Sequence, residues 1–563
     1  MLNSSLRPSL QHSSLSIQHF LLLFLALCPY FVGLADSSIW DANEAFYVET
    51  PREMIERGDY INPTFNYEPR INKPVLSYWI VAGFYHLFGV SPAVQRIPIA
   101  IGGMVLVATA FLLARAASPE GRTGAAWWAA IGLAVSPRLL MFSRRIFIDI
   151  YITMFMALTL LCFALAERYP ERRRLFLVLM YASVGLGMLT KGPIAALLPG
   201  LVFAIYLAAH RELGRVRDML IPLGTLIVLA IVVPWYAALY QQAGWAPIKS
   251  FFLGENVARY MEGVGVNAER PFWWYLPVVF SDSFPWSIFL FPAAALWFHD
   301  RRRNSRSAPV RIRTLLWIWI LVIVGFFSLS AGKQDLYIYP IVPAIVALAG
   351  IVIDRALDTT AADRPRVGLV TGVIAAVLIF AGAGFLTLFN SAFAVYALAG
   401  SALVGVGAMI GGSTAMLLAR RRSAAALLVI VSTLVFVNWV FVWQVLPSFE
   451  KYKPAPGLAA ELEKRAGPGD LLVTYNVALP SLVYYLRRHI EVFYDHGPVL
   501  ELLQSGRPLY LMVSRDDYER AIKPLEPSPM CRVSSQLTFD VKLKNVLSRD
   551  RLPEVLLLTN QCQ

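Results

Sequence analysis

Long apolar runs alternate with short polar connections along most of this chain. A helix needs roughly 20 apolar residues to cross a bilayer, and thirteen runs approach or reach that length. They fall near 17–35, 93–115, 124–136, 148–166, 175–190, 193–209, 219–240, 274–298, 314–331, 336–353, 366–388, 392–418 and 424–446. The pattern predicts a polytopic α-helical membrane protein with about thirteen transmembrane helices, the first of which is an uncleaved N-terminal span.

One further apolar run, residues 74–90, does not fit this series. It is short and carries Ser77, three aromatic residues with hydroxyl or indole groups, and His86. Such a composition is typical of a helix lying in the membrane interface rather than crossing it. A crossing at this point would also put the polar stretch 40–73 on the opposite side from 144–149 and 333–339.

The pattern changes after residue 446, where short β-rich runs such as "GDLLVTYN" and "RPLYLMVS" alternate with helical ones. This alternation predicts a small α/β domain. We therefore divide the chain into a transmembrane domain, 1–446, and an extracytoplasmic α/β domain, 447–563. Within the first domain, residues 36–92 form the first outer loop with its interfacial helices.

Composition and charge support a membrane protein and set its orientation. The chain is 57% hydrophobic and only 15% charged, and its mean hydropathy is +0.56, values foreign to a soluble domain. The net charge of +13 comes largely from arginines in alternate connections, such as "ERYPERRR" and "HDRRRNSRSAPVRIR". These follow the positive-inside rule, so they mark the cytoplasmic side rather than a nucleic-acid site. The other connections and the C-terminal domain then face outward, into the periplasm of a bacterial inner membrane.

The four cysteines divide by location. Cys28 and Cys162 fall in apolar runs, where a small buried thiol is expected. Cys531 and Cys562 fall in the outward domain, where a disulfide is chemically permitted but sequence alone does not decide the pairing.

Ionisable and polar residues gather in the outward connections. Each costs roughly 2.5 to 3.5 kcal/mol at membrane depth, so their repeated occurrence on one side indicates a shared site. The candidates are Asp41, Asn43, Glu44 and Lys73 in the first loop, then Arg144, Asp149, Lys191, Arg270, Lys333 and Tyr337.

Their chemistry suggests cations that hold a phosphate beside carboxylates that act on an acceptor. Lys73, Arg270 and Lys333 could neutralise a lipid phosphate, to which Tyr337 would donate a hydrogen bond. Asp41, Glu44 or Asp149 could deprotonate or orient an acceptor, and these three stay open as alternatives. Asn43, Arg144 and Lys191 are supporting candidates.

Several ordered motifs carry a family resemblance. "WDANEAFYVETPREM", "NKPVLSYW", "LTKGPIAALLPG", "RPFWWYLPV" and "GKQDLYIYP" resemble motifs of the polyprenyl-phosphate-sugar glycosyltransferases of C-type fold. The bacterial aminoarabinose lipid A transferases and their protein-mannosyltransferase-like relatives are the groups it resembles, over roughly residues 17–350.

The resemblance implies a C-type fold and an inverting transfer of a sugar from a polyprenyl (undecaprenyl) phosphate donor. The acceptor would be lipid A, another glycan or a protein; neither sugar nor acceptor is specified by the sequence. In that family a lysine, a later outer arginine and a tyrosine contact the lipid phosphate, and we match these to Lys73, Arg270 and Tyr337.

Two positions depart from the family pattern. Asn43 stands where the aminoarabinose transferases have aspartate, and Asn72 replaces a glutamate that helps to hold a metal in some relatives. An amide is no base, so the carboxylate role would pass to Asp41 or Glu44. The usual zinc ligands are not matched, so we assign no cofactor; a divalent metal stays possible.

A transporter or flippase of a lipid-linked or anionic substrate is the alternative function, because many spans with buried charges also mark substrate pathways. The candidate residues lie on one side, however, whereas alternating access needs a site at the bilayer midplane between repeats, and the sequence shows no internal repeat.

Overall fold

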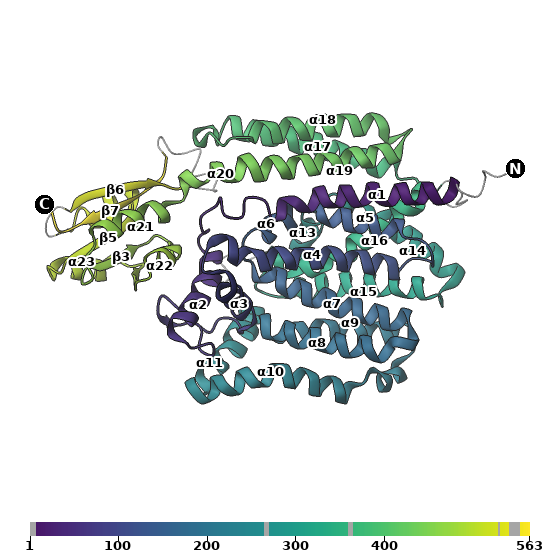
Figure 1. Cartoon of the computed structure of the whole chain (residues 1–563), viewed down its shortest axis with the longest axis horizontal. Coiled ribbons are helices and arrows are strands. Elements are labelled where there is room, and N and C mark those ends of the chain that lie inside the picture. Colours follow the sequence, from purple (N-terminus) through teal and green to yellow (C-terminus); the bar gives the residue numbers. More distant parts are fainter. Residues whose placement is uncertain (1–6, 264–269, 359–363, 527–529, 540–551, 563) are drawn as a thin grey trace.

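The computed structural model describes residues 7–263, 270–358, 364–526, 530–539 and 552–562. Most of these residues are helical, and the long helices lie side by side in one bundle (Figure 1). A small sheet with its own helices stands at one end of the bundle, and the N-terminus lies at the other end.

The helical part contains these elements, in chain order: α1 (Arg7–Leu27), α2 (Asn43–Arg57), α3 (Leu76–Phe88), α4 (Pro92–Ala116), α5 (Gly124–Ala134), α6 (Pro137–Ser143), α7 (Ile148–Arg168), α8 (Arg173–Lys191), α9 (Ile194–Ala209), α10 (Ile221–Ala243), α11 (Trp245–Lys249), the π-helix η4 (Ser250–Ala258), α12 (Arg259–Glu262), α13 (Tyr275–Asp282), α14 (Leu290–Asn304), α15 (Ala308–Ser328), the 3-10 helix η7 (Asp335–Ile341), α16 (Val342–Leu357), α17 (Gly368–Asn390), α18 (Ser401–Ala419), α19 (Ser423–Val440) and α20 (Leu446–Ser448).

Each of the thirteen apolar runs is helical over most of its length, but the runs are not alike. In the described residues, nine helical segments are long and apolar enough to cross a membrane, and two bent pairs raise this number to eleven. The remaining two runs give shorter apolar helices, Ile17–Tyr30 and Ile194–Ala209. The thirteen runs therefore all contain helix, but at most eleven of the helical segments in the described residues are long enough to span a membrane.

The two bent pairs have local causes. Between α5 and α6 the axis turns by 60°, because Ser136 caps the new helix and Pro137 at its first position cannot donate a hydrogen bond to the old one. Between residues 282 and 286 the axis turns by 106°, and Pro285 lies at this break.

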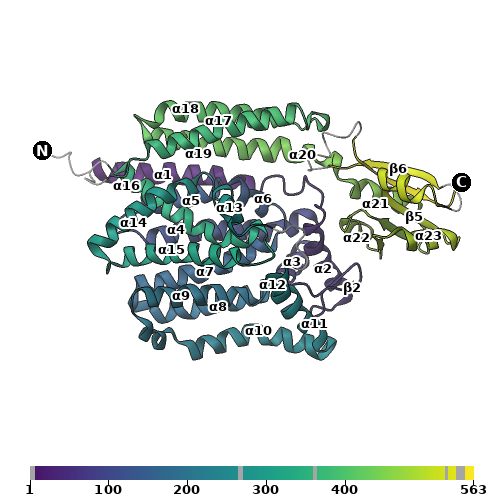
Figure 2. The same ribbon diagram turned by 180° about the vertical axis from the view of Figure 1, so that it is seen from behind.

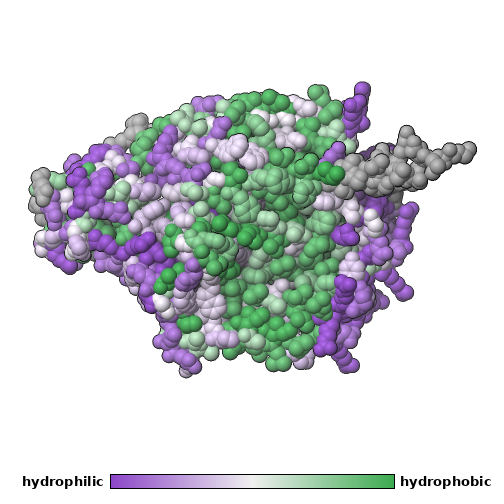
Figure 3. Space-filling view, viewed as in Figure 1, coloured by the Kyte–Doolittle hydropathy of each residue, from purple (hydrophilic) through white to green (hydrophobic). Residues whose placement is uncertain are grey.

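A hydrophobic belt crosses the face of the bundle that Figure 3 shows, with hydrophilic surface at both ends of it. α10 and α17 contribute strongly to this belt, because only 17% and 28% of their most apolar 18-residue stretches are buried in the protein. An apolar belt of this kind needs lipid rather than water around it, so the chain is a multi-pass membrane protein.

Helix α3 is the segment that the sequence placed in the interface. Its 13 residues span about 20 Å, well short of a hydrocarbon core about 30 Å thick. Lys73, just before α3, lines the same cavity as Lys191 and Tyr337. These three residues therefore lie on one side, as they must if α3 does not cross the membrane.

The C-terminal region, from α21 (Pro454–Arg465) onward, forms a five-stranded mixed sheet of order β4-β3-β5-β7-β6. β3 pairs in parallel with β4 and β5, whereas β7 runs antiparallel to β5 and β6. The elements are β3 (Leu471–Tyr475), α22 (Ser481–Leu486), β4 (Glu491–Phe493), α23 (His496–Gln504), β5 (Leu509–Ser514), β6 (Cys531–Leu537) and β7 (Glu554–Thr559).

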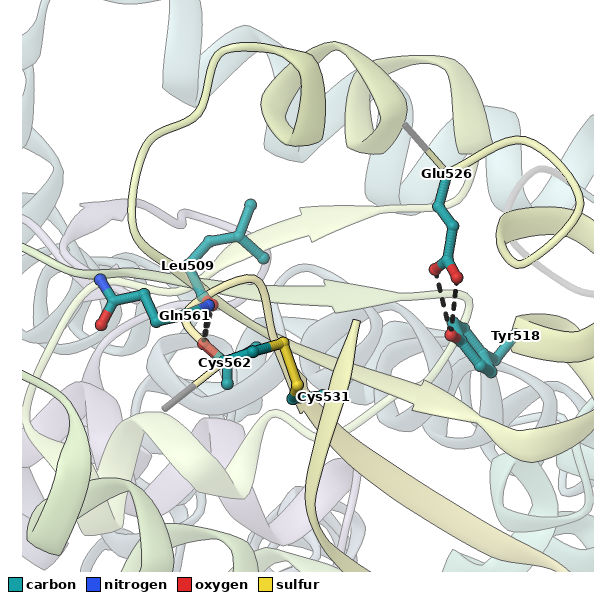
Figure 4. Close-up of a disulfide and its surroundings, with 7 residues drawn as sticks. Leu509, Tyr518, Glu526, Cys531, Gln561 and Cys562 are labelled. Atoms are coloured by element: carbon teal, nitrogen blue, oxygen red, sulfur yellow. Dashed lines mark hydrogen bonds between the residues drawn. A yellow bond between two sulfur atoms is a disulfide. The ribbon is translucent and has the colours of Figure 1, made fainter. Parts of the chain in front are cut away.

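Alternate residues of the central strands enter two separate cores. Leu472 and Met512 pack with α21 and α22 on one face, whereas Val473 and Val513 pack with α23 on the other. Both faces are buried, so the strands read as continuous apolar runs. Cys531 and Cys562 form a disulfide that joins the start of β6 to the chain just after β7 (Figure 4). This result decides the pairing that sequence alone left open.

The C-terminal region and the first polar segment, residues 36–73, lie at the same end of the bundle (Figures 1 and 2). The Asp41 carboxylate accepts hydrogen bonds from the backbone N–H and the hydroxyl of Ser481, at 2.7 and 2.9 Å. The side chain of Asn66 donates to the carbonyl of Ile490 and accepts from its N–H. Segments more than 400 residues apart in sequence therefore form one polar unit.

Arg96, in the second turn of α4, anchors this unit to the bundle. Its guanidinium forms a bidentate pair with the Glu44 carboxylate at 2.7 and 2.9 Å, and both side chains are at most 1% exposed. It also donates to the carbonyls of Leu34, Ser37 and Ser38. A fully satisfied buried arginine of this kind fixes the path of the first segment where it leaves the bundle.

The Arg96 anchor yields a stability prediction. Arg96→Ala leaves the Glu44 carboxylate buried without a counter-ion, so we expect the free energy of unfolding to fall by roughly 3 to 5 kcal/mol. Unfolding by heat or by denaturant in detergent measures this loss of stability. Arg115→Ala is the matched control, because Arg115 is exposed at the other end of the same helix. Similar stabilities for the two variants would contradict the anchoring role.

Candidate functional site

A cavity of about 660 Å³ lies at the end of the bundle that carries the first polar segment. Its walls come from α7, α8, α9, η4, α12, α15 and η7, together with the turn before α3. Figure 2 shows α11 and α12 close to α2 and α3 at this end of the bundle. The cavity thus lies where the apolar belt meets the polar end.

Cationic side chains converge on this cavity from three separate elements. Lys73, Lys191 and Arg259 line it, and among the described lining residues Glu255 is the one carboxylate. The Lys73 ammonium lies 2.7 Å from the Glu255 carboxylate, and the Arg259 guanidinium lies 3.4 Å from it. The lining therefore holds an excess of positive charge suited to an anion.

Local sequence explains how two of these elements meet. α8 ends at Lys191, where a cation is favoured by the helix dipole, and Gly192 follows with φ +99°. A Cβ on Gly192 would come within 2.7 Å of the Phe251 ring, so glycine is needed both for the backbone conformation and for the approach of η4. This contact places Glu255 and Arg259 beside Lys191.

The rest of the cavity wall is mostly apolar. The Phe327 and Tyr337 rings pack with their centres 5.1 Å apart, and the Lys191 ammonium lies 5.2 Å from the centre of the Tyr337 ring. Leu253 and Met261 line the cavity and are also exposed at the surface of the bundle. The cavity thus combines charged groups with an apolar flank that reaches the surface.

Burial changes the acidity of the central lysine. Desolvation lowers the pKa of Lys73 below its usual value, and the charge and hydrogen bond of Glu255 only partly offset this effect. An additional anion near the ammonium would favour its charged form and raise the pKa again. An anion that enters the cavity therefore stabilises the charged form of Lys73.

Two residues expected to hold the anion lie outside the lining. Arg270 pairs with Asp335 at 2.6 Å and stacks on Trp274. Lys333 is buried and donates to the carbonyl of Ser330, which itself lines the cavity. Their role in holding an anion stays a prediction, and Arg259, which the sequence analysis did not single out, lines the cavity.

The three candidate carboxylates have different surroundings. Asp149, in the first turn of α7, pairs with Lys191 and so lies directly behind the cavity wall. Asp41 binds Ser481 of α22, as described above. Burial raises the pKa of Glu44, but Arg96 outweighs this effect and holds it below its usual value. Glu44 is thus ionised and held in a buried ion pair with Arg96.

The three supporting candidates lie in different places. Lys191 lines the cavity, whereas Arg144 donates to the carbonyls of Pro29, Val32 and Gly33 and so secures the turn after α1. Asn43 is the first residue of α2 and is exposed. Of the residues that the sequence singled out, the cavity brings together Lys73, Lys191 and Tyr337.

Sequence reasoning missed three residues of the cavity: Glu255, Asn256 and Arg259. They lie in "GENVARY", a short segment of the connection after α10, whose acid and base are four residues apart. This spacing forms an ion pair on a helix, and the π-helix η4 that precedes Arg259 is a feature common at functional sites. The pattern could have pointed to this segment.

A metal ion is commonly held by several His, Cys, Asp or Glu side chains that lie close together. No group of three or more such residues converges within the part of the chain that the structure describes.

Comparisons with known proteins bear on the identity of the fold and the site. Residues 72–237 match the family model described as dolichyl-phosphate-mannose-protein mannosyltransferase. The chain is 29% identical over 362 residues to an undecaprenyl phosphate-α-4-amino-4-deoxy-L-arabinose arabinosyl transferase of Pseudomonas fluorescens, covering 62% of this chain and 60% of that protein. A transferase of the same name from Pseudomonas aeruginosa is 32% identical over 57% of each chain. The chain thus matches about three fifths of the length of these curated relatives.

Solved structures show the fold over nearly the whole chain. ArnT from Cupriavidus metallidurans, solved bound to undecaprenyl phosphate, matches with a TM-score of 0.76 and 24% identity over 96% of this chain and 97% of that one. The archaeal oligosaccharyltransferase AglB from Archaeoglobus fulgidus matches with a TM-score of 0.52 and 13% identity, over 90% of this chain and 70% of that one. The chain has the C-type glycosyltransferase fold, and its resemblance to polyprenyl-phosphate-sugar glycosyltransferases is confirmed.

Proposed function

We propose that this protein, whose fold is that of the C-type glycosyltransferases, moves a sugar from a polyprenyl (undecaprenyl) phosphate donor to an acceptor of the cell envelope. The acceptor is lipid A, another glycan or a protein. The transfer inverts the configuration at the anomeric carbon of the sugar, as the family resemblance implies.

The cavity is the single observation that carries this proposal. Lys73, Lys191 and Arg259 line it together, and its flank is lined by Leu253 and Met261, apolar residues that are also exposed at the surface of the bundle. A long apolar chain with a phosphate at one end has the same division into charged and apolar parts. Neither a soluble nucleotide sugar nor a small inorganic anion would use the apolar flank.

The reaction needs cations more than an acid at the leaving group. An acceptor hydroxyl attacks the anomeric carbon, and the bond from that carbon to the phosphate oxygen breaks with its electron pair going to the phosphate. Lys73, Lys191 and Arg259 stabilise this growing charge, while the Tyr337 hydroxyl donates a hydrogen bond to it. The polyprenyl monophosphate is the second product.

The acceptor proton needs a base, and Asp149 is the carboxylate best placed to take it. It pairs with Lys191, a residue of the cavity wall, so it lies nearest to the leaving phosphate among the three candidates. The catalytic roles predicted for Asp41 and Glu44 stay predictions. Their contacts with Ser481 and Arg96 support a role in holding the acceptor side of the site in shape.

We further propose that the cavity faces the periplasm of a bacterial inner membrane. The arginine-rich connections lie at the far end of the bundle from the first polar segment, which supports this orientation through the positive-inside rule. In this proposal residues 1–446 form the transmembrane domain and residues 447–563 an extracytoplasmic domain that covers the first polar segment.

The assay that tests the function uses purified protein in detergent and a panel of polyprenyl-phosphate sugars with candidate acceptors. Release of polyprenyl phosphate together with glycosylated acceptor supports the proposal, and no release from any donor contradicts it. Asp149→Asn should lower turnover about 100-fold or more, because the amide is no base, while donor binding is largely kept, because the amide oxygen can still accept the hydrogen bond of Lys191. Full turnover in this variant would move the base to Asp41 or Glu44.

Paired arginine variants test which cation binds the phosphate. Arg259→Ala should weaken binding of polyprenyl monophosphate by about 10- to 100-fold, as expected for the loss of one charge-assisted contact. Arg270→Ala should change it less than about threefold, because Arg270 is engaged with Asp335. Affinity is measured by quenching of intrinsic fluorescence or by calorimetry in detergent. A larger loss in Arg270→Ala would restore the assignment made from sequence.

Cysteine labelling tests the orientation. Ser505 is exposed in the C-terminal region and Ser305 is exposed in an arginine-rich connection. In intact spheroplasts, a membrane-impermeant maleimide should label Ser505→Cys, while Ser305→Cys should react only after permeabilisation. Unsubstituted protein gives the background from Cys28 and Cys162, and the reverse pattern would overturn the proposed topology.

A further inference from the structure

The position of Glu255 is not explained by the proposed chemistry. Its carboxylate forms ion pairs with Lys73 at 2.7 Å and with Arg259 at 3.4 Å. These are two of the three cations that the phosphate would need. It lies on the π-helix η4 and lines the cavity itself, with 23% of its side chain exposed. An acid placed among phosphate-binding cations must weaken anion binding.

The loss of binding that Glu255 causes differs between the donor lipid and the product lipid, because the two carry different charges. A donor with its sugar attached is a phosphodiester and carries one negative charge. The product is a phosphate monoester, whose second ionisation has a pKa of about 6, so it carries close to two charges at neutral pH. Repulsion by a nearby carboxylate therefore acts more strongly on the product than on the donor.

We propose that Glu255 is a selectivity residue that sets the affinity of the cavity for phosphate charge. With no lipid bound, it holds Lys73 and Arg259 in place. After sugar transfer, it repels the dianionic product, so that polyprenyl monophosphate leaves and a new donor can enter. This inference rests on the proposed function and gives the same cavity a means of distinguishing donor from product.

Several groups surround Glu255, and they fix what a pH experiment can report. Lys73 and Arg259 pair with it directly, and Lys191 and Tyr337 share the cavity wall. Its charge also reaches the hydroxyls of Tyr47 on α2 and Tyr78 on α3, both of which have raised pKa values because of burial. Asp149 stands behind Lys191.

The test compares two affinities in the same protein. We measure the inhibition constant of polyprenyl monophosphate and the KM of the donor in unsubstituted protein, Glu255→Gln and Glu255→Ala. At pH 8 the neutral variants should bind the product about tenfold more tightly relative to the donor, and turnover should stall as product accumulates. At pH 5.5, where the product carries about one charge, the difference should nearly vanish.

Two controls separate charge from shape. Glu255→Asp keeps the carboxylate and should retain the ratio of the unsubstituted protein. Glu262→Gln removes an exposed acid from the neighbouring helix α12, outside the cavity lining, and should change nothing. Equal weakening of donor and product in both neutral variants, or an unchanged ratio at pH 8, overturns the inference while the transferase assignment stands. No turnover in the unsubstituted protein overturns the proposed function itself.

Discussion

The buried pair of Arg96 and Glu44 is the interaction on which the polar end of this protein depends. The first segment leaves the bundle as irregular chain, whose carbonyl groups need donors at a depth where water is scarce. Arg96 supplies five donors from a rigid guanidinium, and it uses them on Glu44 and on three of these carbonyls. Lys73, which lines the cavity, lies at the end of the same segment.

Ion pairs have different roles at the two ends of the bundle. At the arginine-rich end, Glu167 pairs with Arg173, Arg215 and Arg311. The cations there are thus partly neutralised by protein acids and bind neighbouring helices to one another. At the cavity, Lys73 and Arg259 pair with Glu255, and Lys191 pairs with Asp149. Similar ion pairs therefore join helices at one end and line a cavity that can admit a ligand at the other.

The sequence predicted the class of fold well, because the physics behind it is local. Runs of apolar residues become helices in a bilayer whatever their neighbours, so all thirteen runs were located correctly. The short helix α3 was also identified, since its length and aromatic residues are visible in sequence. The division of the runs into straight, bent and short helices depended on Ser136, Pro137 and Pro285, whose effects on helix direction a hydropathy count ignores.

The site was harder to predict, because it depends on which polar residues face one another. Lys73, Lys191 and Tyr337 were identified from motif and topology, and they line one cavity. Arg259 and Arg270 lie on the same connection, between α10 and α13, and nothing in their local sequence shows that Arg270 is held by Asp335 from another segment. Long-range pairing of this kind also accounts for Glu44 and Asp41, whose partners lie 52 and 440 residues away.

The separation between Asp41 and Ser481 has a consequence for biosynthesis. Chains grow at roughly 5 to 20 residues per second, so Ser481 emerges about 20 to 90 seconds after Asp41. During this interval the first segment is already outside the bundle, and the C-terminal sheet that will cover it does not yet exist. Arg96 follows Glu44 by only 52 residues, so the anchor can form early. The nascent protein can therefore hold its polar segment in place long before the covering region arrives, and a ribosome that stops before the sheet is made would leave this segment anchored but uncovered.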